Sequence, residues 1–258
     1  MPEEMKNFDF PVPLQKGAVY GPLHSRRLGL SLGINLLPGD RKICNLDCLY
    51  CYYGRTDFRL SADACPPAEI ILAEVESEFR KNPLLDYITF SGNGAASLHP
   101  QFPALVRSIR LLRDKYYPGI PLAILSNSAG LSSEEILETY SLFDHPIMKL
   151  DTGDETVFRK LNRPKKGITL KGIVEVLKSM RGITIQTLFT EGICNCKGKA
   201  LEKWLRTISE INPAAIQIYT LDRSLPQQGL IKLEHEELLG LQKLITAESG
   251  LPVKAFTD

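Results

Sequence analysis

Short apolar runs alternate with longer amphipathic stretches along most of this chain. The short runs are rich in aliphatic and β-branched residues, as strands are, and the stretches between them are typical of helices. Strands that alternate with helices in this way predict βα units and a parallel sheet. The predicted strands cover 28–37, 87–92, 122–127, 147–151, 184–189 and 215–221, and the predicted helices cover 67–81, 101–116, 133–142, 168–180, 198–210 and 234–248.

Six such units predict the α/β class, as a partial (β/α)6 TIM-like barrel with parallel strands. Pro83 and Pro213 lie at joints between a helix and a strand, and the alternation resumes at once on either side. We therefore expect one domain over 1–258, with 1–19 as an N-terminal extension. Ligands of such folds bind at the carboxyl ends of the strands, so functional residues are expected there.

The composition suits a globular protein with a substantial core, because 43% of the 258 residues are hydrophobic. The net charge of +1 gives no overall field that would attract a phosphate backbone. The start of the chain, MPEEMKNFDF, has no long apolar segment, and no later stretch approaches the length needed to span a bilayer. We expect a cytoplasmic protein that does not bind membranes.

Three of the six cysteines fall within CNLDCLYC, which is too clustered for a secreted disulfide framework. Cys44, Cys48 and Cys51 have the spacing C-x3-C-x2-C. Three thiolates hold three irons of a 4Fe-4S cluster and leave the fourth iron open, whereas iron-sulfur electron carriers normally supply four cysteines. One alternative is a zinc site completed by His24 or His99, although zinc sites usually pair their ligands as two close couples. The other is a buried trio of thiols without a metal.

This spacing, with the aromatic Tyr50 before the last cysteine, resembles the radical S-adenosylmethionine (SAM) superfamily. The resemblance implies that a reduced 4Fe-4S cluster cleaves SAM to methionine and a 5′-deoxyadenosyl radical, which abstracts hydrogen from a substrate. It also implies an external electron donor of the flavodoxin or ferredoxin type. The backbone of Tyr50 is expected near the adenine. The protein would position the reactants and shield them.

The second predicted strand ends in Gly92, Asn93 and Gly94, which alone would indicate a turn. In the superfamily, a glycine-rich segment at this place binds the amino group of the methionine moiety, so the resemblance implies SAM binding here. The family pattern continues with an acidic residue and a proline, whereas this chain has Ala95 and Ala96. One expected polar contact to SAM is therefore missing.

Polar residues also end the third and fourth strands. Asn127 and Asp151 are predicted to bind SAM, because an amide or carboxylate at a strand end suits ribose hydroxyls. Asp151 is the first choice for the ribose, and the alternative is that it caps the helix that begins near Glu155. For Asp154 we prefer the capping role.

Tyr219, at the end of the last strand, is also predicted to bind SAM. Asp222 and Arg223 follow it. They either form a surface ion pair of small energetic weight or contact the adenine or the substrate at the mouth of the barrel.

Beyond the cysteines, the segments 20–35, 88–94, 150–164 and 216–224 resemble the iron-sulfur oxidoreductase branch that includes the tRNA wyosine synthases. Those synthases bind a second cluster through upstream cysteines, and no cysteine precedes Cys44 here. Modification of a tRNA base therefore remains an alternative, as does an electron carrier that cleaves nothing. The substrate, whether a small molecule, a peptide or an RNA, is left open by the sequence.

Cys65, Cys194 and Cys196 are the remaining cysteines. The first precedes the first helix, and the other two follow the fifth strand, so a barrel would place all of them at its upper rim. They either hold a second iron-sulfur cluster or metal ion together, or are unrelated loop residues.

Overall fold

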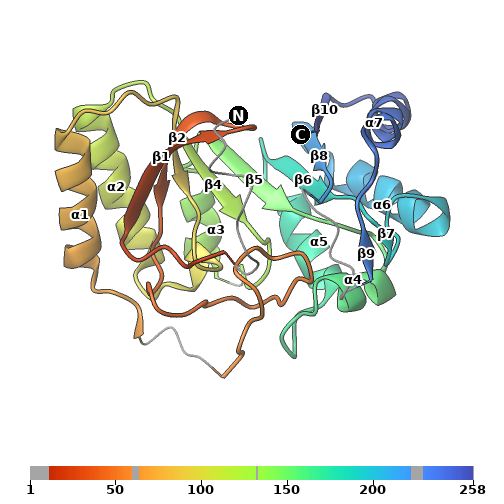
Figure 1. Ribbon diagram of the computed structural model, residues 1–258, viewed down its shortest axis with the longest axis horizontal. Helices are drawn as coiled ribbons and strands as arrows, with labels where there is room; N and C mark the ends of the chain where they lie inside the picture. Colours follow the sequence, from red (N-terminus) through yellow and green to blue (C-terminus); the bar gives the residue numbers. More distant parts are fainter. Residues whose placement is uncertain (1–11, 60–63, 132, 222–228, 258) are drawn as a thin grey trace.

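The computed structural model describes residues 12–59, 64–131, 133–221 and 229–257, and its centre is a curled sheet of eight strands (Figure 1). Strands β1 and β2 are antiparallel, and all other neighbours in the sheet are parallel. This arrangement confirms the predicted α/β partial barrel. The strands, in their order across the sheet, are β1 (Val19–Ser25), β2 (Gly29–Ile34), β3 (Tyr87–Phe90), β4 (Leu122–Ser126), β5 (His145–Lys149), β6 (Thr184–Leu188), β8 (Ala215–Tyr219) and β10 (Val253–Phe256).

The six predicted strands are all present, but the sequence missed the two edges of the sheet. Strand β1 alternates half-buried and exposed residues, so no apolar run marks it. Strand β10 is four residues long and pairs only with β8. A separate antiparallel ribbon of β7 (Glu191–Gly192) and β9 (Leu230–Ile231) was also missed, because two-residue strands leave no periodic pattern.

The helices lie on the outer side of the sheet (Figure 1). Asp154 is the N-cap of α4, since its side chain accepts hydrogen bonds from the backbone of Thr156 and Val157, as predicted. No helix in the described ranges is both long and apolar enough to cross a bilayer. The helices are α1 (Ala68–Arg80), α2 (Phe102–Tyr116), α3 (Glu134–Tyr140), α4 (Glu155–Leu161), α5 (Leu170–Ser179), α6 (Gly198–Ile211) and α7 (His235–Ser249), and a 3-10 turn covers Ala96–Leu98.

The main apolar core lies between the outer face of the sheet and these helices. Alternate residues of each central strand point into it, such as Phe90 of β3 and Ile185 of β6, both fully buried. Trp204 of α6 is fully buried in the same core, and its indole nitrogen donates to the carbonyl of Leu150 just after β5. The core therefore fixes the carboxyl ends of the strands, where the candidate site lies.

We predict that Leu105→Ala lowers the free energy of unfolding by about 2–5 kcal/mol, because Leu105 of α2 is fully buried in this core. The matched control is Leu111→Ala in the same helix, where the side chain is 70% exposed and the change should stay within about 0.5 kcal/mol. Urea unfolding of both variants and the parent measures the difference. Equal effects of the two substitutions would contradict the assigned burial of α2.

Candidate functional site

The predicted cluster cysteines lie on one loop that follows the carboxyl end of β2. On one side this loop pairs with the segment after β3. The backbone nitrogen of Ile43 donates to the carbonyl of Asn93 at 3.0 Å, and the carbonyl of Ile43 accepts from the backbone nitrogen of Ala95, also at 3.0 Å. Ile43 and Gly94 form a parallel bridge. These bonds hold Cys44 beside the glycine segment that the sequence associated with SAM.

On its other side the loop is joined to the end of α4. The backbone nitrogens of Asp47 and Leu49 donate to the carbonyls of Asn162 and Leu161, each at 3.0 Å. The Asp47 carboxylate is buried; it accepts from the backbone of Thr56 at 2.7 Å and pairs with Arg55 at 2.8 Å. Two separate attachments therefore fix the backbone that carries the three thiols.

Two of the three thiols receive a hydrogen bond from a side-chain amide. Asn127 Nδ2 donates to Cys44 Sγ and Asn162 Nδ2 donates to Cys48 Sγ, each at 3.4 Å. All three cysteines are free of disulfides. Burial raises the pKa of the Cys44 thiol, and burial together with the charge of Asp151 raises the pKa of Cys48 to about 12. Thiolates in so enclosed a place need compensating positive charge, which iron ions supply.

This donor set suits a cluster better than a single metal ion. In the described part of the chain, no three His, Cys, Asp or Glu side chains converge around one ion, whereas a cubane cluster takes each thiolate on a different iron. His99 is engaged elsewhere, because Nε2 lies 2.9 Å from the carbonyl of Pro66 and Nδ1 accepts from the backbone of Gln101. It is therefore not the fourth ligand of a zinc site.

The glycine segment after β3 has a structural reason for its composition. Gly92 and Gly94 both have φ of +139°, and a Cβ at Gly94 would lie 1.8 Å from the carbonyl oxygen of Ile43. Asn93 is fully buried, and its side-chain amide exchanges hydrogen bonds with the backbone of Gln15 and donates to Pro38. The segment thus holds the cluster loop, and the side chain of Asn93 is directed into the fold.

Asp151 lies at the centre of a buried network and does not cap α4. One carboxylate oxygen accepts from the backbone of Leu188 at 2.9 Å and pairs with Lys149 at 3.2 Å. The other accepts from the Tyr50 hydroxyl and from Asn162 Nδ2, the latter at 2.7 Å. The capping alternative for Asp151 is therefore wrong, while its role toward a ribose stays a prediction.

Lys149, at the end of β5, places a buried cation in this network. Its ammonium nitrogen donates to the Tyr219 hydroxyl at 2.6 Å and lies over the rings of Tyr50 and Tyr219 at 4.7 and 4.8 Å. Burial acts to lower its pKa, but Asp151 and Tyr219 outweigh burial and hold the pKa above its usual value. Lys149 is therefore charged. Asp222 and Arg223 lie outside the described residues.

Two buried polar atoms on the residues around the thiols have no hydrogen-bond partner within the described chain. They are Oδ1 of Asn162, whose amide contacts Cys48, and Oγ of Ser128, which follows Asn127 in the chain. Ser128 has a φ of +63°, an uncommon conformation for a serine. Orphaned buried acceptors and hydroxyls often mark the place of a ligand. A small cavity adjoins this region, lined by Leu46, Asn127, Lys149, Leu150, Asp151, Phe158, Asn162 and Ile173.

Sequence reasoning assigned no role to Asn162, Lys149 or Asn195. Asn162 contacts Cys48, Tyr50 and Asp151, although it is 112 or more residues from the first two. Asn195 is fully buried, and its amide donates to the carbonyls of Asp151 and Leu188. An amide at the end of a helix or in a loop has no periodic pattern, so only the resemblance of segment 150–164 pointed toward Asn162.

The three remaining cysteines are not brought together. Cys194 Sγ and Cys196 Sγ are 3.6 Å apart and follow β7 in the chain, whereas Cys65 belongs to the segment that leads into α1. Figure 1 shows α1 and β7 at opposite ends of the sheet. A site that uses all three thiols is thus not formed by the described residues. A role for the Cys194–Cys196 pair stays a prediction.

Comparison with known proteins agrees with this geometry. The sequence profile of the Radical SAM superfamily matches residues 42–211, which begin just before Cys44 and end with α6. Among solved structures, Streptococcus suis SuiB bound to S-adenosylmethionine has a TM-score of 0.62 at 14% identity, over 87% of this chain and 50% of that one. TYW1 with a lysine-pyruvate adduct has a TM-score of 0.59 at 15% identity, over 85% and 74%. At such low identity these two structures show a shared fold.

Curated relatives were found at higher identity. The chain is 26% identical to a GTPase Obg of Brachyspira hyodysenteriae, covering 93% of this chain but 35% of that protein. It is 33% identical to a UPF0026 protein of Methanocaldococcus jannaschii, over 83% and 66%, so it spans about a third to two thirds of these two relatives. A UPF0026 protein of Synechocystis is 31% identical over 92% of this chain and 95% of its own length. The chain therefore belongs to the radical SAM superfamily and, within it, to the UPF0026 proteins.

Proposed function

We propose that this protein is a radical SAM enzyme that reductively cleaves S-adenosylmethionine and uses the resulting radical to remove hydrogen from its substrate. The observation that carries the proposal is the cluster loop. It presents three thiols at the carboxyl edge of the sheet, and two of them receive amide hydrogen bonds from neighbouring loops. Membership of the superfamily supports the same chemistry.

In this proposal Cys44, Cys48 and Cys51 hold the 4Fe-4S cluster. A cluster held there would supply the electron that cleaves bound SAM. Asn127 and Asn162 stabilise the thiolates by N–H···S hydrogen bonds, which tune the reduction potential of iron-sulfur clusters. The enclosed position of the loop limits the access of water to the reacting groups.

SAM is proposed to bind across the strand ends next to the cluster loop. Tyr50 and Asp151 have the clearest support, because both lie beside Cys48 in one buried network. Ala95 is buried and brings no carboxylate, so its contribution is limited to backbone contacts. The proposed SAM-binding residues are Tyr50, Gly92, Asn93, Gly94, Asn127, Asp151 and Tyr219.

The polar side chain of Asn93 is already engaged with Gln15 and Pro38 and shapes the glycine segment, so its proposed contact with SAM would come from its backbone. The remaining parts of the proposal follow from the chemistry. A low-potential donor of the flavodoxin or ferredoxin type would reduce the cluster, the whole chain would act as one domain, and the reaction would take place in the cytoplasm.

We predict that the reconstituted protein, given a strong reductant and SAM without air, forms 5′-deoxyadenosine, and that Cys48→Ala abolishes both the product and the brown cluster. Cys65→Ala is the matched control, because Cys65 lies outside the C-x3-C-x2-C motif, and it should keep colour and product. Chromatography and absorption spectra measure both. An intact cluster that yields no 5′-deoxyadenosine, either alone or with cell extract as a source of substrate, would contradict the proposal.

Replacing Asn127 with leucine should lower the reduction potential of the cluster. The variant Asn127→Leu keeps the branched shape of the side chain but removes the hydrogen bond to Cys44 Sγ. That bond favours the more electron-rich reduced state. Loss of about 1 kcal/mol corresponds to about 40 mV for one electron. A redox titration followed by electron paramagnetic resonance measures the shift. An unchanged or higher potential would show that this bond does not act on the cluster.

The double variant Cys194→Ala, Cys196→Ala should keep the iron content of the parent. The pair supplies only two thiolates, with the sulfur atoms 3.6 Å apart, whereas an iron-sulfur cluster is normally held by three or four. Iron and sulfide analysis of the reconstituted proteins measures the content. A loss of about half the iron would show instead that the pair holds a second cluster.

A further inference from the structure

The inner, concave face of the sheet is mixed. An apolar cluster around Leu28, Ala123 and Ile147 covers its middle strands β4 and β5, and polar side chains lie on the strands to either side, where the interior of a closed barrel is usually filled with branched apolar side chains. Ser31 of β2 and Thr89 of β3 share a hydrogen bond of 2.7 Å between their hydroxyls. Gln186 of β6 donates to Gln217 of β8 at 3.1 Å. These residues alternate along their strands with the apolar residues that enter the main core. Polar side chains in a half-open barrel suit a polar ligand.

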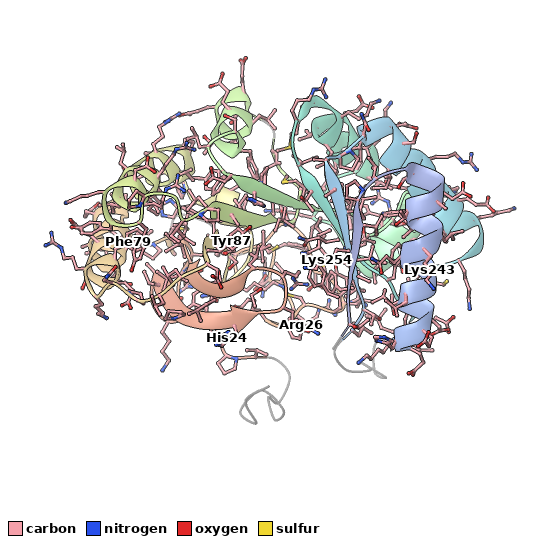
Figure 2. All side chains as sticks on the ribbon, turned by 90° about the horizontal axis from the view of Figure 1, so that it is seen from above. His24, Arg26, Phe79, Tyr87, Lys243 and Lys254 are labelled. Atoms are coloured by element: carbon pink, nitrogen blue, oxygen red, sulfur yellow. The ribbon has the colours of Figure 1, made fainter. Side chains whose placement is uncertain are left out.

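Arg27 extends into this interior from the amino end of β2, whereas the candidate site lies at the carboxyl ends of the strands. It lies on the turn between β1 and β2, at the amino end of β2, and its guanidinium lies 4.9 Å from the ring centre of Tyr219 on β8. The contact spans the open side of the curled sheet. Figure 2 shows this turn, marked by Arg26 and next to His24 at the end of β1, facing the strand that carries Lys254. The turn is held by Ser25, whose hydroxyl accepts from the backbone of Arg27 and Leu28.

Tyr219 is therefore contacted by two cations whose charges are balanced differently. Lys149 pairs with Asp151 and donates to the Tyr219 hydroxyl. Arg27 takes part in none of the ion pairs formed within the described ranges; it rests on the aromatic ring. A guanidinium stacked on a ring keeps its in-plane N–H donors available, and their fork matches the oxygens of a carboxylate or phosphate.

We propose that Arg27 binds an anionic group of the substrate, a carboxylate or a phosphate, inside the half-barrel. The group would lie beside Tyr219, where Lys149 adds positive potential from the side of the cluster. This proposal rests on the proposed function, because it places the substrate between the turn that carries Arg27 and the site of radical formation. The competing structural role for Arg27 is a latch that closes the barrel.

The test is calorimetric binding of two probes, inorganic phosphate and succinate, to the reconstituted protein saturated with SAM and kept without reductant. We expect the parent to bind at least one probe, and Arg27→Gln to weaken that binding by about tenfold or more. Arg26→Gln is the matched control: it makes the same charge change at the neighbouring position and should leave the dissociation constant within about twofold. Arg27→Lys should fall between, because lysine keeps the charge but loses the fork.

Each outcome of the titration either supports or overturns the role of Arg27 in binding an anion. Binding of phosphate alone would assign the site to a phosphate group, and binding of succinate alone would assign it to a carboxylate; either supports the proposal if Arg27→Gln weakens it. No binding by the parent, or equal losses from Arg26→Gln and Arg27→Gln, would overturn the proposal. A thermal unfolding curve of each variant separates loss of binding from loss of folding, and Arg27→Lys carries the test if Arg27→Gln does not fold. Because no cleavage is needed, failure here is independent of the 5′-deoxyadenosine assay.

Discussion

The buried carboxylate of Asp151 joins the parts from which the site is built. It accepts from the backbone of Leu188 on β6, from Tyr50 on the cluster loop and from Asn162 at the end of α4, and it pairs with Lys149. A carboxylate removed from water costs several kcal/mol unless its oxygens are fully hydrogen-bonded or paired. Here both are, so the cluster loop, two strands and a helix are held to one charged centre. Loss of that charge would leave Lys149 buried without its carboxylate.

The two faces of the sheet divide the structural and the chemical tasks. The outer face packs aliphatic and aromatic side chains against the helices, and this core includes Trp204, which also binds the carbonyl of Leu150. The inner face carries a small apolar cluster around Ala123 and Ile147 on β4 and β5, and polar residues on the strands to either side, namely Ser31, Thr89, Gln186 and Gln217. A half-barrel can keep polar residues there, because its open side leaves space for ligands that a closed barrel fills with side chains.

Much of the fold was predictable because apolar periodicity is a local property. The six central strands and the helices follow it directly, and the cap at Asp154 follows from the residue type. The edge strands β1 and β10 were missed because exposed or very short strands carry no apolar run. The spacing of Cys44, Cys48 and Cys51 is also local, so the amino-acid sequence alone predicts the cluster loop.

The rest of the site depends on contacts between residues far apart in the chain. Asn162 reaches Cys48 across 114 positions, and Lys149 reaches Tyr219 across 70. The sequence around Asn162 or Lys149 contains no pattern that indicates these partners. The glycine segment was recognised from its residue types, but its role was not. The positive φ at Gly92 and Gly94 and the lack of a Cβ at Gly94 allow Ile43 to pack against the segment, whether or not a ligand binds there. The glycines predicted a special backbone segment after β3, and only the fold shows which atoms this segment contacts.

In the proposed function, the three thiols would leave one iron of the cluster open for S-adenosylmethionine. Electron paramagnetic resonance of the reduced, reconstituted protein tests it most directly, recorded with and without SAM. Because SAM binds the open iron in this account, its addition should change the g values of the reduced cluster, and the change should be absent when methionine alone is added. A spectrum that is identical with and without SAM would contradict the account and would favour a cluster that only carries electrons.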